Sequence, residues 1–192
     1  PITHCNPRLK DHRSRSIGLP YPNTEARIVH LKSGKPVPPN MPGELQVRGP
    51  QIMKEYFEND QETRAILARD GWLSTGDIAK MDADGYFYIL DRKKDLILYG
   101  GFNVYPTEVE TVLNQHPSVK ESAVVGIPDE YYGETVKAFV VLNENAESRE
   151  DELISFCQGK LAKYKFPKQI EFVDNLPKNF IGKILRRQLI KG

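Results

Sequence analysis

The sequence predicts an α+β protein in two parts: a β-rich part at residues 1–91, and a small α+β domain at residues 92–192 whose mixed sheet is flanked by helices. Three observations predict this class. Before position 91, apolar residues recur in the two-residue period of strands or stand between glycines. Further along, short apolar strands alternate with segments of helical period. Between the two parts, "DRKKD" (91–95) is a run of charged residues between apolar strands, which predicts an exposed linker.

The β-rich part is predicted to hold one short helix among its strands. Its first 20 residues show neither a helix nor a strand pattern. The elements expected after them are strands at 24–31 and 43–49, a helix at 60–68 with Asp60 at its cap position, and two strands across 72–90 joined at Asp84-Gly85.

The second part is predicted to alternate strands and helices. A buried strand at 95–99 precedes a helix at 106–116, which has Pro106 in its first turn and Val109, Val112 and Leu113 on one face. The remaining elements are strands at 122–127 and 136–142, a helix opened by a Ser148–Asp151 capping box with Leu153, Ile154, Cys157 and Leu161 on one side, a strand at 169–174, and a closing helix at 183–191.

Composition excludes several classes of protein. With 27 basic and 26 acidic residues the net charge is +1, so no basic field indicates a nucleic-acid partner. Two distant cysteines, Cys5 and Cys157, favour a reduced, intracellular protein over a disulfide scaffold. No apolar run approaches about 18 residues, so we expect no transmembrane segment. The polar, proline-bracketed opening leads us to expect that the chain is cut from a longer polypeptide.

The segment "GKILRR" (182–187) places Lys183 after a glycine and ahead of two arginines. A Walker phosphate loop is excluded, because position 177 is proline where glycine is needed and Ile184 follows the lysine. A solvated basic helix end and a single cation held for catalysis both remain open.

Each of four other patterns has both a structural and a functional interpretation. In "STGD" (74–77), Asp77 could satisfy turn amides or accept two hydrogen bonds from a ribose diol. In "YGGFN" (99–103), the two glycines indicate a close approach by another strand or by a slender ligand. "DADG" (82–85) favours a hairpin over a calcium loop, since it lacks the distal glutamate. The four histidines (His4, His12, His30 and His116) lack metal-ligand spacing, so we assign no metal ligand.

The order of five segments is more specific than any one of them. They are "GELQVRGPQIMKEYF" (43–57), "DGWLSTGD" (70–77), "DGYFYILDRKKDLILYGGFNVYPTEVE" (84–110), "HPSVKESAVVGIPDE" (116–130) and "LPKNFIGKILRR" (176–187). This series resembles the carboxyl-terminal third of adenylate-forming enzymes, and within them most closely the fatty acyl-CoA synthetases, or long-chain fatty acid–CoA ligases. The resemblance covers essentially the whole chain. It implies that residues 1–91 end a large AMP-binding domain and that 92–192 form the mobile carboxyl-terminal domain.

Such enzymes form an acyl-adenylate from a carboxylic acid and ATP with Mg²⁺, and then transfer the acyl group to coenzyme A. By resemblance, Asp77 holds the ribose hydroxyls of ATP, Arg92 contacts the ribose and a nearby phosphate, and Lys183 is the catalytic adenylation lysine. The hinge between the two half-reactions matches Lys94. The resemblance implies a cytoplasmic enzyme and leaves peripheral contact with the inner membrane face open.

Coenzyme A contacts are implied at four positions. Gly100 and Gly101 match the loop that lets the pantetheine arm pass, while Tyr164 and Lys168 match an aromatic residue and a cation near the nucleotide end. Phe166 stands where some relatives have arginine, which puts a phosphate contact there in doubt.

Other adenylate-forming enzymes remain as alternatives: an aryl-CoA ligase, a peptide-synthetase adenylation domain, or a luciferase-like oxygenase. A non-catalytic excised module is the alternative from another class. "YGGFNVYPTEVE" (99–110) favours CoA ligases over peptide synthetases, and Leu98 replaces a lysine that luciferases often carry. Because the family's phosphate loop and acyl tunnel lie upstream, we expect the isolated chain to be inactive. We also expect its β-rich part to expose apolar surface, so that the two parts differ in stability or the first part pairs with a second copy of itself.

Overall fold

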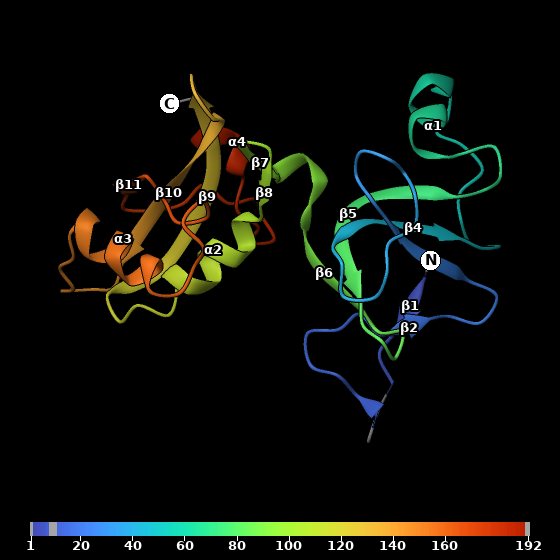
Figure 1. Cartoon of the computed structure of the whole chain (residues 1–192), viewed down its shortest axis with the longest axis horizontal. Coiled ribbons are helices and arrows are strands. Elements are labelled where there is room, and N and C mark those ends of the chain that lie inside the picture. The colour runs from blue at the N-terminus through green and yellow to red at the C-terminus, as the bar shows by residue number, and fades with distance from the viewer. Residues whose placement is uncertain (1, 8–10, 191–192) are drawn as a thin grey trace. The chain divides into compact units, whose positions relative to one another are not determined.

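The computed structural model describes residues 2–7 and 11–190, and it divides into two compact units, one ending at Lys94 and one beginning at Asp95 (Figure 1). The predicted boundary lies after residue 91. Residues 92–94 stay with the first unit because its last strand extends through Arg92, and because the Lys93 ammonium pairs with Glu44 at 2.7 Å. The fold is α+β, as predicted.

The first unit is built on an antiparallel sheet whose four strands are neighbours in chain order, β3-β4-β5-β6. Its elements are β1 (His4–Cys5), β2 (Leu19–Pro20), β3 (Glu25–Val29), β4 (Gly43–Arg48), α1 (Asp60–Ile66), β5 (Leu73–Met81) and β6 (Phe87–Arg92), followed by a 3₁₀ turn at Lys93–Asp95. The core on this sheet contains Ile28, Leu45, Val47, Ala79 and Phe87. The predicted strands at 24–31, 43–49 and 72–90 are confirmed.

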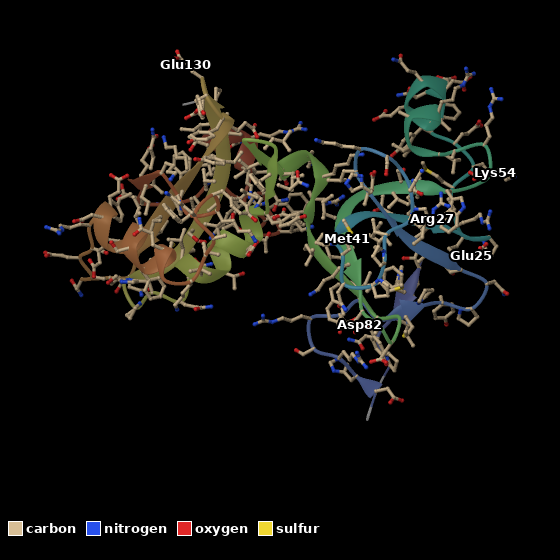
Figure 2. The ribbon with its side chains drawn as sticks, in the orientation of Figure 1. Glu25, Arg27, Met41, Lys54, Asp82 and Glu130 are labelled. Atoms are coloured by element: carbon tan, nitrogen blue, oxygen red, sulfur yellow. The ribbon has the colours of Figure 1, made fainter. Side chains whose placement is uncertain are left out.

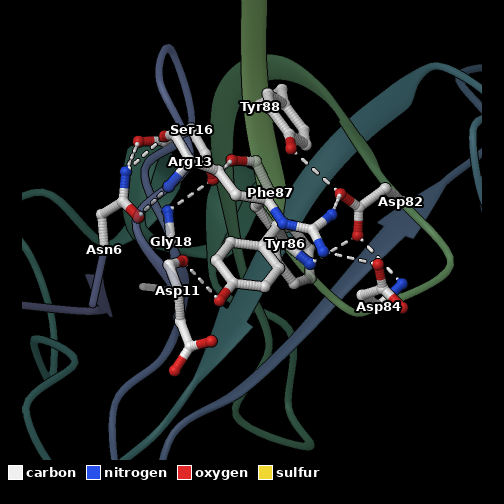
Figure 3. A network of polar contacts seen from close by, with 10 residues as sticks. All are labelled: Asn6, Asp11, Arg13, Ser16, Gly18, Asp82, Asp84, Tyr86, Phe87 and Tyr88. Carbon is white, nitrogen blue, oxygen red and sulfur yellow. Dashed lines mark hydrogen bonds and ion pairs between the residues drawn. The ribbon is translucent and has the colours of Figure 1, made fainter. Parts of the chain in front are cut away.

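A polar network joins residues 11–18 to the β5–β6 hairpin, in a stretch where no local pattern predicted structure (Figure 3). The Arg13 guanidinium donates to Asp82 at 2.7 Å and to Asp84 at 2.5 Å, and the Ser16 hydroxyl donates to the Phe87 carbonyl at 2.8 Å. Asp82 Oδ1 in turn accepts the backbone N–H groups of Asp84 and Tyr86, each at 3.0 Å. "DADG" is therefore the turn of a hairpin, as predicted, and the short β1–β2 pair forms beside it.

Two local predictions in the first unit are wrong. The N-cap of α1 is Asn59 rather than Asp60, because the Asn59 side chain accepts the Glu62 N–H at 3.1 Å. The predicted exposed linker is in part a strand: Asp91 lies within β6 and is only 6% exposed. Elsewhere in this unit the Arg27 guanidinium, labelled in Figure 2, lies 4.0 Å from the centre of the Trp72 ring.

The second unit is a sheet with β10 at its centre. Its elements are β7 (Ile97–Tyr99), β8 (Phe102–Val104), α2 (Pro106–Leu113), β9 (Val119–Asp129), β10 (Gly133–Leu142), α3 (Glu150–Gln158), β11 (Gln169–Phe172) and α4 (Arg186–Leu189). β10 pairs antiparallel with β9 and β7 and parallel with β11, and β7 pairs antiparallel with β8. The sheet is thus mixed, as predicted. Glu130 marks the turn between β9 and β10 (Figure 2).

The two faces of this sheet carry separate cores, because side chains along a strand alternate between faces. Val124, Val136, Ala138 and Val140 face α2 and α3, with Val109, Leu113, Leu153 and Cys157 in the same cluster. Ala123, Val125, Phe139 and Val141 lie in a second cluster with Leu176, against which Ile184 and Leu189 pack. The predicted apolar faces of both helices are confirmed.

Three predictions in the second unit need correction. α3 begins after Arg149 with no side-chain cap, because the Ser148 hydroxyl donates to Glu152 at 2.9 Å instead of forming a capping box. A strand, β8, occupies residues 102–104, where none was predicted. The closing helix begins at Arg186 rather than at Lys183, because Ile184 forms a bridge with Lys178 and keeps the backbone extended there.

Candidate functional site

Asp77 and Arg92 lie opposite each other on neighbouring strands of the first unit. They are register partners of β5 and β6, and Arg92 Nε lies 3.1 Å from Asp77 Oδ1. The Asp77 side chain is 26% exposed and that of Arg92 is 55% exposed. Asp77 thus lies within a strand rather than in a turn, with one carboxylate edge against a guanidinium.

The backbone of Asp77 is held by the preceding threonine. The Thr75 hydroxyl donates to the Leu45 carbonyl at 2.9 Å and accepts the Asp77 N–H at 3.1 Å. Burial raises the pKa of Asp77 above its ordinary value of 3.8, and the Arg92 charge and the Thr75 hydroxyl oppose that rise. A half-buried carboxylate of this kind binds donors more strongly than a solvated carboxylate does, because the local dielectric is lower.

A largely apolar groove of about 520 Å³ lies beside this pair. Its lining comes from the amino-terminal segment, β4, β5, β6 and the segment after β4: Ile2, Thr3, His4, Ile17, Leu45, Val47, Gln51, Ile52, Met53, Leu73, Thr75, Asp77 and Ile89. Two of its polar atoms, His4 Nε2 and Gln51 Oε1, are buried without a hydrogen-bond partner among the described residues. Burial lowers the pKa of His4 to about 4, so its ring is neutral at pH 7.

In the second unit, Gly100 and Gly101 form the two-residue turn of the β7–β8 hairpin. Their φ angles are +54° and +86°, the left-handed pair that a hairpin turn of this length requires. A Cβ on Gly100 would lie 3.2 Å from the Tyr132 ring, whereas one on Gly101 would meet no described atom within 4 Å. The close approach at Gly100 therefore comes from Tyr132, and the space beside Gly101 is open.

Of the other residues matched to coenzyme A contacts, Tyr164 lies beside this hairpin and Lys168 lies against Phe166. The Tyr164 ring stacks on Phe102 of β8 with a centroid separation of 4.7 Å. Lys168 Nζ lies 4.5 Å from the ring centre of Phe166, which is itself a buried core residue. Phe166 thus packs in the core and offers no cation for a phosphate.

Lys183 ends a tight loop instead of starting a helix. Asn179 Oδ1 accepts the N–H groups of Ile181 and Lys183 at 3.1 and 2.9 Å, and the Asn179 N–H donates to the Lys183 carbonyl at 2.9 Å. Gly182, with φ at +81°, completes the turn. The Lys183 side chain is exposed, and because α4 begins only at Arg186, Lys183 is not part of a basic helix end.

Sequence reasoning missed the anchor of this loop. Arg186, three residues after Lys183, donates to both carboxylate oxygens of Glu110 at 2.8–2.9 Å. Glu110 Oε1 also accepts the Val124 N–H of β9 at 2.8 Å. A glutamate next to Val109 on the buried side of a predicted helix was the available signal, since a buried charge requires a partner.

The hinge candidate, Lys94, lies where the two units meet in sequence. Lys94 is exposed, lies in the 3₁₀ turn at Lys93–Asp95 and is the last residue of the first unit. Within residues 2–7 and 11–190, no group of three or more His, Cys, Asp or Glu side chains is placed to hold a metal ion. Over the same residues, no helix is long and apolar enough to cross a membrane.

Comparison with protein families gives two matches along the chain. Residues 1–57 match the family model described as AMP-binding enzyme, and residues 108–183 match the model described as AMP-binding enzyme C-terminal domain.

Curated relatives match over nearly the whole chain. A long-chain-fatty-acid–CoA ligase of Bacillus subtilis is 50% identical over 191 residues, which is 100% of this chain and 34% of the relative. One from Escherichia coli O6:H1 is 51% identical over 98% of this chain and 33% of its own length. A 2-succinylbenzoate–CoA ligase of Geobacillus kaustophilus is 48% identical over 85% of this chain and 33% of its own. The chain spans about a third of the length of these relatives.

Solved structures match both the fold and the sequence. ATP-bound MatB from Rhodopseudomonas palustris superposes with a TM-score of 0.91 at 39% identity, over 97% of this chain and 37% of the other. The apo structure of the same protein gives 0.69 over the same coverage, so that relative adopts two shapes in the matched region. An o-succinylbenzoate CoA synthetase of Bacillus subtilis, in complex with its acyl-adenylate intermediate, gives 0.82 at 40% identity over 91% of this chain and 35% of the other.

Proposed function

We infer that this chain, which belongs to the family of AMP-binding, adenylate-forming enzymes, is the nucleotide-contacting and mobile part of an ATP-dependent acid–CoA ligase. One observation carries the proposal: the half-buried Asp77 carboxylate held against Arg92 across β5 and β6. A carboxylate has two acceptor oxygens, and a ribose offers two adjacent hydroxyl donors. Arg92 favours the ionised form of Asp77 and leaves most of its own guanidinium available for an anionic oxygen.

In the first half-reaction an acid carboxylate oxygen attacks the α-phosphorus of ATP, and pyrophosphate leaves with the electrons of the broken P–O bond. Negative charge then builds on the phosphate oxygens. Lys183, whose backbone is held by the loop from Asn179, would stabilise that charge with its ammonium. Mg²⁺ enters with the nucleotide as part of the substrate, as it does at phosphate-transfer sites generally.

In the second half-reaction the thiol of coenzyme A attacks the acyl carbonyl, a C–S bond forms, and AMP leaves. The open side of Gly101 supports the passage of a slender chain there, because a side chain would fill the space. Tyr164, stacked beside the hairpin, would add an aromatic surface for the nucleotide end. Lys168 would add a cation for its phosphates, and rotation about Lys94 would alternate the two sites.

We propose a long-chain fatty acid as the substrate acid. The support is that relatives 50–51% identical over nearly all of this chain are long-chain-fatty-acid–CoA ligases. The 48% identical 2-succinylbenzoate–CoA ligase favours an aryl acid as the second candidate. The isolated 192-residue chain, with only part of such a site, is proposed to be inactive.

The test is acid-dependent release of pyrophosphate from ATP by the full-length protein that contains this chain. Fatty acids of several lengths, 4-coumarate and 2-succinylbenzoate are compared, with Lys183→Ala as the variant. We expect release with fatty acids, and we expect its loss in the variant with retention of thioester formation from a supplied acyl-adenylate. Pyrophosphate release with aryl acids only would show that the substrate is an aryl acid and not a fatty acid. Absence of release with every acid would overturn the proposed function.

A further inference from the structure

The Lys183 loop is joined to the rest of the second unit by a buried ion pair that the function described above does not use. Arg186 contacts Glu110 of α2 through Nε at 3.2 Å and Nη2 at 2.8–2.9 Å. The Glu110 side chain is 12% exposed and that of Arg186 22% exposed. A bidentate pair this sheltered from solvent is geometrically demanding, and removing one partner leaves a buried charge without its counterpart.

The same arginine also reaches the start of the second unit. Arg186 Nη1 lies 3.8 Å from a carboxylate oxygen of Asp95, whose side chain is 17% exposed. Asp95 is the residue directly after Lys94, where the two units meet in sequence. One guanidinium therefore joins three places in the second unit: the junction with the first unit, helix α2 and the helix that follows Lys183.

Glu110 fixes the other end of this connection to the sheet. Its Oε1 accepts the Val124 N–H at 2.8 Å, a donor of β9 that points away from the partner strand. The helix that carries Arg186 lies over the opposite face of the sheet, where Ile184 and Leu189 pack on the second core. The Arg186 side chain thus reaches Glu110 past strand β9, and it connects the α4 face of the sheet to the α2 face.

The loop itself is held closed from within. The Asn179 side chain accepts two hydrogen bonds and its backbone makes two more, to Gly182 and Lys183, which together fix the backbone of Lys183. Between Asn179 and Lys183, Phe180 is 99% exposed and Ile181 61% exposed, so the loop is not held by apolar burial of its tip. At its base the loop is held by the Lys178–Ile184 bridge and by Ile184 in the second core, and Asn179 and Arg186 add the polar contacts on either side of Lys183.

We propose that Arg186 and Glu110, with Asn179 at the base of the loop, are positioning residues that hold Lys183 at a fixed place relative to the hinge. This inference rests on the proposed function of Lys183. Because Arg186 binds the first residue of the second unit, rotation about Lys94 carries Lys183 as part of a rigid body. A displacement of about 1 Å at a reacting group can cost on the order of 10²-fold in rate.

The test compares matched variants of the full-length protein in each half-reaction. Arg186→Met removes the charge and keeps the length of the side chain, and Arg187→Met makes the same change at its exposed neighbour. We expect Arg186→Met to lower the adenylation kcat by about 10²-fold with little change in KM for ATP. Thioester formation from a supplied acyl-adenylate should stay within twofold, and Arg187→Met should stay within twofold in both steps.

A merely structural role gives a different result. The Gly100–Gly101 hairpin belongs to the same unit, so general loss of that unit would lower both half-reactions together. Equal loss in both, or equal rates for Arg186→Met and Arg187→Met, would overturn the proposal. Asn179→Ala, with the exposed Asn175→Ala as its control, decides the matter if Arg186→Met does not fold, since it should lower adenylation alone.

A measurement without catalysis separates this inference from the proposed function. In the 192-residue chain, amide hydrogen exchange at Ile181 and Lys183 should accelerate at least tenfold in Asn179→Ala, and that of Val124 should accelerate in Glu110→Ala. Unchanged exchange in both variants would overturn the anchoring itself. A wild-type protein without acid-dependent pyrophosphate release would instead overturn the proposed function, whatever the exchange rates are.

Discussion

Asp77 is a residue at which stability and nucleotide binding should oppose each other. Burial raises its pKa, so the folded chain favours the protonated acid more than the unfolded chain does. Its contribution to stability is therefore present below the ordinary pKa of 3.8 and is lost as the pH rises through the higher folded value. At neutral pH the buried charge destabilises the first unit, while its two oxygens serve the proposed ribose contact.

We expect Asp77→Asn to melt at a higher temperature than the wild-type chain at pH 7, and the difference to shrink toward pH 4. AMP should bind more weakly, because the amide keeps only one acceptor oxygen. Thermal unfolding across this pH range and calorimetric titration with AMP, in the full-length protein, would measure both. A variant less stable than wild type at pH 7 would contradict the electrostatic argument, since Arg92 is exposed enough to lose its partner at little cost.

The turn of the β7–β8 hairpin needs glycine for two reasons: its backbone has positive φ angles, and the proposed path of pantetheine passes beside it. Gly101→Ala places a Cβ in open space but at a φ of +86°, so it should destabilise the second unit by about 1–2 kcal/mol through backbone strain alone. Thioester formation should fall more than adenylation, because the methyl group narrows the proposed pantetheine path. Chemical denaturation and the two half-reaction rates would measure these effects.

Gly34→Ala is the matched control for that variant. Gly34 has a φ of +66° and would also place its Cβ where no described atom lies within 4 Å, but it is in a turn of the first unit far along the chain from any proposed contact. A similar loss of stability with both half-reactions intact is expected. If Gly101→Ala behaves in the same way, the hairpin has no role in the thioester step.

The 3₁₀ turn at Lys93–Asp95 is the element assigned to the hinge. Lys94→Pro fixes φ near −65° and restricts the residue before it, so it should hold one arrangement of the units. Adenylation should survive and thioester formation should fall, while Lys94→Ala leaves both rates near wild type. The two shapes of MatB support such a motion in a relative. Normal rates in both half-reactions for both variants would show that the hinge is not at Lys94.

Elements with strong local signals could be predicted, and those made by distant contacts could not. Pro106 and its apolar spacing marked α2, and Asp84-Gly85 marked a hairpin, because each signal acts within one turn of chain. β8 was missed because its three residues gain their strand conformation by pairing with β7. The capping box failed at Ser148, whose hydroxyl has an alternative partner in Glu152 that only the folded helix presents.

The same distinction applies to the candidate site. Motif order was enough to select Asp77, Arg92 and Lys183, and the first two were then found 3.1 Å apart across a strand pair. The contact between Glu110 and Arg186 joins residues 76 positions apart. No local pattern could connect them, although a charge on the buried side of α2 indicated that a partner was required.

At the scale of the whole molecule, the apolar groove of the first unit predicts association of the isolated chain. Ile89 lines the groove and is 39% exposed, while Phe57 lies outside it and is 88% exposed. Sedimentation of the 192-residue chain over a range of concentrations should reveal a dimer that Ile89→Lys dissociates and Phe57→Lys does not. A monomer at every concentration, or equal effects of the two variants, would show that the groove is not the contact.

The central place of β10 also sets the order in which the protein can form during synthesis on the ribosome. In the first unit each strand of the main sheet pairs with the next one made, so its sheet can assemble strand by strand as the chain emerges. In the second unit β10 cannot complete its pairing until β11 has been made. The second core is not covered until Ile184 and Leu189 have been made. A chain made only as far as Leu142 would hold a complete first sheet, and α2 would already cover one face of its β9–β10 pair, but the face that Ile184 and Leu189 cover would be open to solvent or to a chaperone.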